Sequence, residues 1–386
     1  MKPFFNKYFT TILISAFAVF LALAGVSCKQ KQSEAKAAEA IKDSLDRTRN
    51  DSIAEFRKKF SPDTFPLIKY KRYAIRSQKE LREILARFPQ TDPSDKKVFD
   101  KSRIIRTMNR KELRYFRVGD TIVAPETIID DVRAYSCFPN YYYEARDIPK
   151  IIIVSNKYQA YACYEYGKLT RFAAGNTGKE KSQTYPGRYA MNWRQRLRHS
   201  SIDSTWILPW TWNIHLEAGN AFHQFDMPGR PVSHSCIRQF KEDAEWLYSW
   251  GRGAKKDSST GRFVPFSGTP VLIIDVFDWN RKKGGPWLDS KNNRENLLLL
   301  PSNPLEYEEA LIPIKQIPKS SRGVLRNKQR YITAEDTLRA RGVIRPGVEI
   351  TESVNYNKLR REKAAKKAKE QKAKEQKAKE IKPVFD

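Results

Sequence analysis

Short strand-like runs follow one another closely in the middle of the chain, and they restrict the possible folds more than any other feature. Residues 150–154 form a mostly apolar run, and residues 158–164 alternate as a half-buried strand does. The triplet 166–168 is a hairpin turn signal before the returning run 169–174. Many short strands at this spacing predict a mainly β, sandwich-like domain with one or more helices.

One helix and a closing strand complete this region. Residues 240–250 place Phe240, Ala244 and Leu247 on one helical face, and Gly251 ends the pattern. The apolar run 271–276 then predicts a last core strand. We therefore expect a domain over residues 149–278, with hydrophobic residues at 40% of the chain providing its core.

The first 28 residues are predicted to direct export. Two lysines precede an apolar run from about residue 11 to residue 23, and small residues then lead to Cys28. This order resembles a bacterial lipoprotein signal, which implies acylation of Cys28 and a periplasmic protein anchored by lipid to a membrane of the cell envelope. A plain signal peptide and a retained membrane helix are the alternatives.

The rest of the chain divides by composition. Residues 61–148 predict a smaller α+β N-terminal module, with a short helix at 81–88 and a turn into a strand at 117–125. The second feature is faintly similar to the end of a lysin-motif repeat, but an ordinary accessory module is favoured. The remaining segments are a polar tether (29–60), a C-terminal extension (279–357) and a basic low-complexity tail (358–386).

The chain is strongly basic, with a formal net charge of +28. Residues 358–382 hold 12 Lys/Arg and 4 Glu, which contributes +8 of that charge. Their period of five leaves no apolar face, so a solvated helix and a disordered tail are both open. An exported protein rarely meets nucleic acid, and the tail therefore favours anionic lipid, lipopolysaccharide or acidic wall polymers as partners.

The candidate site centres on Cys236, which has His234 before it and Arg238 after it. The turn signal 228–231 separates it from His223. An antiparallel hairpin about this turn would place His223 opposite Cys236, with Cβ atoms about 5 Å apart. Because the thiolate is the reactive form of cysteine, a neighbouring imidazole makes Cys236 a candidate nucleophile.

Other readings of these residues stay open. A free cysteine is often a small buried hydrophobe. A zinc site would need ligand spacing that is missing here, because the chain has no CxxC or HxxxH pattern, so no metal is expected. His215 is a rival base, although no turn signal would pair it with Cys236. The tryptophans that precede it could line a groove or pack in a core: Trp206, Trp210 and Trp212.

The run 233–238, SHSCIR, resembles the SHGC-x-R signature of the L,D-transpeptidase catalytic domain family. Upstream, 177–179 and 184–189 are similar to the family's TGK turn and its TP-x-G-x-aromatic element, although the order here is Thr-Tyr-Pro-Gly. The resemblance implies Cys236 as nucleophile and His223 as base, with the Gln224 carbonyl orienting the imidazole. It also implies site-shaping or substrate roles for further residues: Ser233, His234, Ser235 and Arg238.

Two positions depart from the family pattern. Ser235 stands where glycine is usual, and Gln224 replaces a residue that is commonly glycine. If position 235 requires a positive φ, serine bears a strain that glycine avoids, while its N–H remains available to an oxyanion.

The resemblance implies cofactor-free acyl transfer on peptidoglycan stem peptides. Cys236 would form a thioester, and an amine of a neighbouring stem would resolve it into a cross-link. Water as acceptor would instead give an L,D-carboxypeptidase or endopeptidase. A non-catalytic wall-binding anchor with a degenerate site is the third alternative. Cys137 and Cys163 would then remain, either as one disulfide or as two buried thiols.

Overall fold

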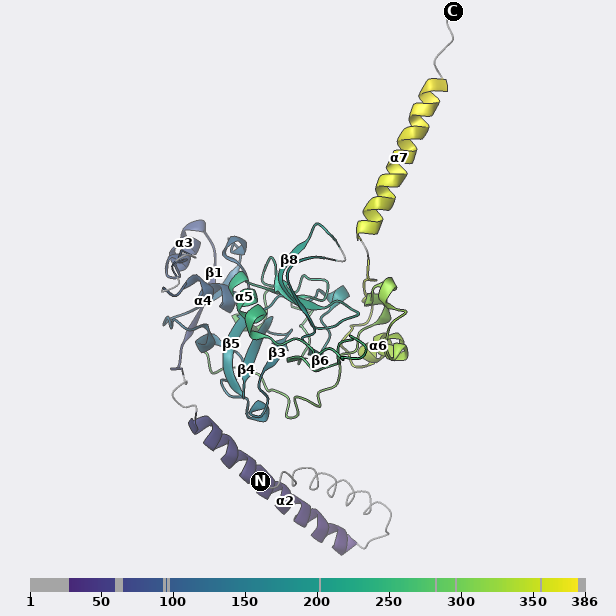
Figure 1. Ribbon diagram of the computed structural model, residues 1–386. Coiled ribbons are helices and arrows are strands. Elements are labelled where there is room, and N and C mark those ends of the chain that lie inside the picture. The colour runs from purple at the N-terminus through teal and green to yellow at the C-terminus, as the bar shows by residue number, and fades with distance from the viewer. Residues whose placement is uncertain are drawn as a thin grey trace, which may run out of the picture. The chain divides into compact units, whose positions relative to one another are not determined.

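The computed structural model describes residues 28–59, 65–92, 95, 98–200, 203–281, 283–295, 297–354 and 356–380. The predicted export signal covers residues 1–28, and all of it except Cys28 lies outside the described residues. The chain divides into two units, 1–62 and 63–386. In the first unit, α2 (Cys28–Lys59) is one helix of 32 residues over the predicted tether (Figure 1). Within the described ranges, no helix is both long enough and apolar enough to cross a membrane.

A five-stranded sheet forms the centre of the second unit, in the order β5-β4-β3-β11-β6. The predicted runs near 150, 158 and 169 are strands, and the last two form the expected hairpin. Neighbouring strands are antiparallel except β3 and β11, which run parallel. The strands are β3 (Ile151–Ser155), β4 (Ala160–Glu165), β5 (Lys168–Ala174), β6 (Gly187–Ala190) and β11 (Pro270–Ile273).

A four-stranded sheet carries the candidate site, in the order β10-β9-β8-β7. Antiparallel pairing joins β7 to β8 and β8 to β9, whereas β9 and β10 are parallel. The strands are β7 (Arg194–His199), β8 (Ile207–Asn213), β9 (Ala221–Gln224) and β10 (Ile237–Gln239). The helix α5 (Lys241–Trp250) follows β10 and ends at Gly251, as the sequence predicts (Figure 1).

One hydrophobic core joins the two sheets and explains the alternation of β3. Ile152 and Val154 pack in this core with Phe222 and Ile237 of the second sheet. The residues between them, such as Ile153, pack in a separate cluster on the opposite face. Successive strand side chains point to opposite faces, so a strand buried on both faces is apolar throughout. The β-rich sandwich expectation thus holds in part, within a chain that is mixed α/β as a whole.

Residues 65–148 contain a two-stranded antiparallel sheet and two short helices. A helix and a strand lie where the sequence predicts them, near residues 81 and 121. Their core also includes Phe277 and Trp287, which follow the strand-rich region in the sequence. The elements are β1 (Tyr70–Ala74), α3 (Gln78–Ala86), α4 (Ser102–Asn109), η2 (Leu113–Tyr115), β2 (Thr121–Pro125), η3 (Val132–Tyr135) and η4 (Tyr143–Ala145).

The C-terminal extension packs directly on the five-stranded sheet. The backbone N–H of Arg188 in β6 donates to Glu308, and Ala310 donates back to Arg188. Gly187 has φ +137, and a Cβ there would lie 2.3 Å from the Ala310 backbone, so this crossing requires glycine. The extension also contributes Ile344 to the core between the sheets. Its elements and the remaining short turns are η5 (Glu180–Ser182), η6 (Pro286–Leu288), η7 (Ile314–Gln316), η8 (Lys319–Ser321), α6 (Lys328–Ala340) and the basic helix α7 (Tyr356–Glu380).

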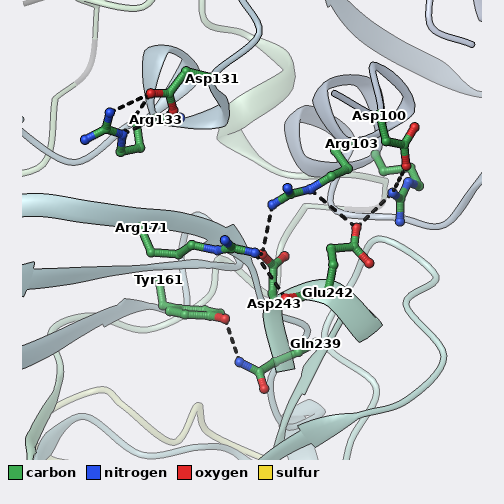
Figure 2. A network of polar contacts seen from close by, with 10 residues as sticks. Asp100, Arg103, Asp131, Arg133, Tyr161, Arg171, Gln239, Glu242 and Asp243 are labelled. Atoms are coloured by element: carbon green, nitrogen blue, oxygen red, sulfur yellow. Dashed lines mark hydrogen bonds and ion pairs between the residues drawn. The ribbon is translucent and has the colours of Figure 1, made fainter. Parts of the chain in front are cut away.

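A network of charged side chains anchors the start of α5, directly after β10 (Figure 2). Arg171 of β5 donates two hydrogen bonds to Asp243, whose side chain is only 2% exposed. Arg103 of α4 approaches the same carboxylate at 3.5 Å. In the same view, Gln239 of β10 donates to the hydroxyl of Tyr161 at 2.6 Å. Buried ion pairs are costly to break, so this network fixes β10 against the central sheet.

Both remaining cysteines are free thiols. Cys163 is fully buried in the core between the sheets. Cys137 is half-buried and packs against two other hydrophobic clusters. Of the two sequence alternatives, the structure therefore contains the thiols and not the disulfide.

Candidate active site

The antiparallel hairpin predicted for His223 and Cys236 is wrong. Strands β9 and β10 are parallel, and His223 pairs with Arg238 while Phe222 pairs with Ile237. Extended by one residue, this register sets Cys236 beside Ala221. Side chains two positions apart share a face of a strand, so Cys236 and His223 are diagonal neighbours on the same face.

The loop between the two strands explains the parallel arrangement. Its turn residues bind other segments: Pro228 bridges Lys111, and the N–H of Gly229 donates to the Asn176 side chain. After β9, the chain leaves the sheet through this loop and returns as β10, which runs in the same direction as β9. A parallel connection needs about a dozen residues or more, a length that 225–236 provides.

Cys236 lies directly before β10, beside the first residue of β9, in a half-buried position. The backbone N–H of Ala221 donates a hydrogen bond to its sulfur. Burial raises the pKa of the Cys236 thiol, while the Ala221 N–H and the positive charges of Arg238 and Arg198 act in the opposite direction. The resting thiol is therefore protonated at neutral pH, and its use as a nucleophile requires a base.

His223 is buried and its ring is fixed by one hydrogen bond. Its Nδ1 lies 2.9 Å from the Gln224 carbonyl oxygen, which is the contact that the sequence predicts. A carbonyl can only accept, so Nδ1 carries the proton and Nε2 carries the lone pair. Burial lowers the pKa of His223, the hydrogen bond to Gln224 raises it and the positive charge of Arg238 lowers it, and together they bring it to about 4. The imidazole is thus neutral at physiological pH, in the tautomer that a general base requires.

The other histidines have different surroundings. The Nε2 of His234 lies 3.1 Å from the Lys179 ammonium, which occupies that nitrogen. Burial lowers the pKa of His234 to about 4, and Lys179 lowers it further. His215 accepts the N–H of Ala218 and packs edge-on against Tyr331. Of the three, His223 has the arrangement that best suits a base.

Ser235 has a φ of 76, in the left-handed region that glycine adopts without strain. Serine at this position is therefore strained. Such a conformation costs a non-glycine residue about 1–2 kcal/mol. The Ser235 carbonyl accepts hydrogen bonds from Thr184 and Asn220, each at 3.1 Å. Because a trans peptide is planar, fixing this carbonyl also fixes the Cys236 N–H, which points the opposite way. No sequence signal identified Asn220, and Thr184 was known only as part of an upstream motif.

Ser233 and the 177–179 turn hold the cysteine loop from the other side. The Ser233 hydroxyl donates to the Cys236 carbonyl, and the Lys179 N–H donates to the Ser233 carbonyl. A Cβ on Gly178 would lie 2.1 Å from the Ser182 carbonyl oxygen. The turn can therefore pass this closely only with glycine at 178.

Arg238 is not among the described residues that line the pocket over the thiol, and it packs on an aromatic side chain. Its guanidinium lies 4.6 Å from the Phe225 ring centroid and donates to the Asp226 carbonyl. The His223 ring meets the same Phe225 edge-on at 5.8 Å. Arg238 thus holds in place the Phe225 ring that packs against His223. Its positive charge also lowers the pKa of both His223 and Cys236.

A pocket opens over Cys236, Ser235 and His234. Its lining also includes Arg198 of β7 and residues 351–354 of the C-terminal extension, neither of which the sequence identified. None of the three candidate groove tryptophans is among the described residues that line it. Trp212 is instead buried, with its indole N–H donating to Leu247. In the ranges that the structure covers, no group of three His, Cys, Asp or Glu could hold a metal ion.

Residues 149–273 match the family model YkuD, the L,D-transpeptidase catalytic domain. Among solved structures, an L,D-transpeptidase of Mycobacterium smegmatis is 14% identical, with TM-score 0.27, over 33% of this chain and 59% of its own. An L,D-transpeptidase of Stackebrandtia nassauensis is 20% identical, with TM-score 0.27, over 33% of this chain and 57% of its own. One of Xylanimonas cellulosilytica is 18% identical, with TM-score 0.31, over 54% of this chain and 100% of its own. No curated protein sequence matches the chain.

Proposed function

Residues 149–273 are a domain of the L,D-transpeptidase catalytic family, and on this basis we propose that the chain is a cysteine acyltransferase that cross-links peptidoglycan stem peptides. The family acts on such stems. The observation that supports the proposal is the Nδ1 contact that fixes the tautomer of His223, whose side chain shares a sheet face with that of Cys236. This arrangement provides a neutral base for a thiol that is protonated at rest.

In the first half-reaction, Nε2 of His223 takes the proton of Cys236 and the thiolate attacks the carbonyl carbon of an L,D peptide bond. The oxyanion that forms accepts a hydrogen bond from backbone N–H groups at Cys236, in the peptide plane that Thr184 and Asn220 hold. The C–N bond then breaks, and the departing D-residue takes the proton from His223. A thioester remains on Cys236.

In the second half-reaction, the amine of a neighbouring stem attacks the thioester carbonyl. Its proton passes to Nε2 of His223, a C–N bond forms, and the C–S bond breaks to release Cys236. Water as acceptor would give a trimmed stem by the same steps. The second candidate function is therefore an L,D-carboxypeptidase or endopeptidase.

Incubation of the purified protein with tetrapeptide-stem muropeptides, followed by mass spectrometry, tests the proposal. We expect cross-linked dimers and, in trapped samples, the mass of a stem bound to Cys236. Trimmed monomers without dimers would favour the hydrolase. No product and no adduct would contradict both and favour a wall-binding anchor.

We also propose that Cys28 carries the lipid that holds the chain at the envelope membrane. The motivation is its place directly after an apolar run. Each buried methylene contributes about 0.8 kcal/mol to such anchoring. Cys28→Ser should release the protein from membranes in high salt, where charge attraction from the basic tail is screened. A variant that stays bound would favour a retained helix.

A further inference from the structure

The C-terminal extension forms one wall of the pocket above Cys236. Gln316 and Pro318 line this wall together with the segment 351–354. The β7–β8 hairpin and the cysteine loop also line the pocket, with Arg198 and residues 234–236. A ligand that reaches the thiol through this pocket must therefore contact the extension.

Backbone hydrogen bonds fix this wall in place. The N–H of Thr351 donates to Lys181 at 2.7 Å, and the N–H of Ser353 donates to Lys315 at 2.8 Å. The Gln316 amide also donates to the Lys181 carbonyl, at 2.9 Å. Ile350, directly before the segment, is buried in the core between the sheets. The wall is thus a built part of the domain.

Two side chains of opposite charge are among the described residues that line this pocket: Arg198 and Glu352. Arg198 is half-buried on β7, where it stacks on Trp193 and has the Gln195 amide oxygen at 3.5 Å. Within the described chain it makes no ion pair with a carboxylate. A guanidinium in this position is free to bind a carboxylate with two parallel hydrogen bonds.

Glu352 is held by two cations that leave half of its carboxylate open. Lys319 and Arg322 both approach Oε1, at 3.6 and 3.3 Å. These contacts orient the side chain, whose other oxygen, Oε2, keeps its lone pairs for a further donor. The side chain is 49% exposed, so a ligand can reach it.

We propose that Arg198 and Glu352 select the acceptor, by binding the zwitterionic amino-acid centre whose amine resolves the thioester. Arg198 takes the carboxylate of that centre, and Oε2 of Glu352 receives its ammonium. The inference rests on the proposed transfer reaction. After binding, the ammonium passes one proton to solvent through Glu352. The neutral amine forms the new C–N bond, its second proton moves to His223, and the C–S bond breaks.

The test compares two acceptors with a tetrapeptide-stem donor: D-methionine, and D-methioninamide, which lacks the carboxylate. Transfer rates of the full chain are divided by each variant's own rate of acylation by a β-lactam, measured by mass spectrometry. We expect wild type to favour D-methionine by about tenfold or more, as a charged hydrogen bond implies.

Arg198→Met should erase this preference, and Arg198→Lys should restore part of it because it keeps the charge. Glu352→Gln should raise KM for both acceptors by a similar factor, about three- to tenfold. Arg196→Met on the same strand and Glu349→Gln before the segment are matched controls outside the pocket lining, and both should behave as wild type.

The proposal is overturned if wild type does not distinguish the two acceptors, or if Arg198→Met retains the preference. It is equally overturned if Glu352→Gln leaves both KM values unchanged. These outcomes differ from failure of the proposed function itself, in which wild type would neither acylate nor transfer. Melting curves of Arg198→Lys and Arg198→Met ensure that lost selectivity is compared between folded proteins.

Discussion

Cys137 and Cys236 each have an arginine nearby, and they differ in whether an imidazole lies beside the thiol in the described chain. Cys137 lies 4.0 Å from the guanidinium of Arg110, in a small cavity that it shares with Tyr70 and Tyr135. Burial nevertheless raises the pKa of Cys137 to about 12. Cys236 also has a raised pKa, but it opens on a larger pocket and has the neutral imidazole of His223 on the same strand face.

The difference teaches that a positive neighbour does not by itself create a nucleophile. At Cys137, Arg110 is fully buried between the rings of Phe172 and Trp287, and the desolvation of the thiolate outweighs its attraction. In the proposed mechanism, the Cys236 proton moves to a fixed acceptor, Nε2 of His223, when a substrate arrives. The proposal therefore rests on two features that Cys137 lacks in the described chain: access from a larger pocket and a neighbouring imidazole.

The largest effect should separate the two thiols directly. Cys236→Ala should abolish transfer and β-lactam acylation, because it removes the atom that forms the thioester. Cys137→Ala should retain wild-type turnover and lose about 1 kcal/mol of stability from reduced packing. Intact-mass measurement of the acyl-enzyme checks both. Acylation of Cys137 by the β-lactam in the Cys236→Ala variant would show that Cys137 is also reactive, and would contradict the comparison.

The next effect concerns the base. His223→Ala should lower the acylation rate by about 10²–10⁴-fold, the usual range for a general base. His215→Ala should have a much smaller effect, since His215 packs between Tyr189 and Tyr331 and does not line the pocket. Acylation rates with a thiol-reactive β-lactam give the ratio. A greater loss in His215→Ala than in His223→Ala would show that His223 is the wrong residue for the base role.

Sequence reasoning selected His223 as the candidate base but misplaced the chain around it. Pro228 and Gly229 look like a local turn, yet their partners are Lys111 and Asn176, more than 50 residues away in sequence. Long-range partners of this kind leave no local pattern, so the hairpin was inferred where a parallel crossover exists. The strands near 150–174 were predictable because their apolar pattern and hairpin turn are local.

The site shows the same division. The family resemblance anticipated strain at Ser235, and its φ of 76 agrees with that expectation. The pocket wall at 351–354 was not predictable, because this segment carries no motif and reaches the site through backbone hydrogen bonds. Arg198 was likewise one arginine among many in a chain with 72 Lys and Arg.

Position 235 offers a smaller effect that sharpens the comparison, since Ser136, the residue directly before Cys137, has an ordinary φ of −71. Ser235→Gly should keep or raise the acylation rate, because glycine adopts a positive φ without strain. Ser235→Val should lower it by about 10–10²-fold through misalignment of the Cys236 N–H, somewhat less than outright loss of an oxyanion donor. Stopped-flow acylation measures both. An inactive glycine variant would mean that the Ser235 hydroxyl itself takes part.

The smallest effect is on stability in acid, and it should arise around Cys236 and not around Cys137, whose cavity lining contains no histidine. Burial lowers the pKa of His223 to about 4 from an unfolded value near 6.5. Between these pH values the unfolded chain binds a proton that the folded chain does not, so stability is full above pH 6.5 and falls toward pH 4. One such group contributes a slope of about 1.4 kcal/mol per pH unit to the free energy of unfolding.

Thermal melts from pH 7 to pH 4 at constant ionic strength test this effect. The melting temperature should decrease less steeply with falling pH for His223→Gln than for wild type. His199→Gln, at an exposed position, is the matched control and should follow wild type. Equal slopes for wild type and His223→Gln would show that folding does not lower the pKa of His223, and they would contradict the buried, desolvated imidazole that the mechanism uses as its base.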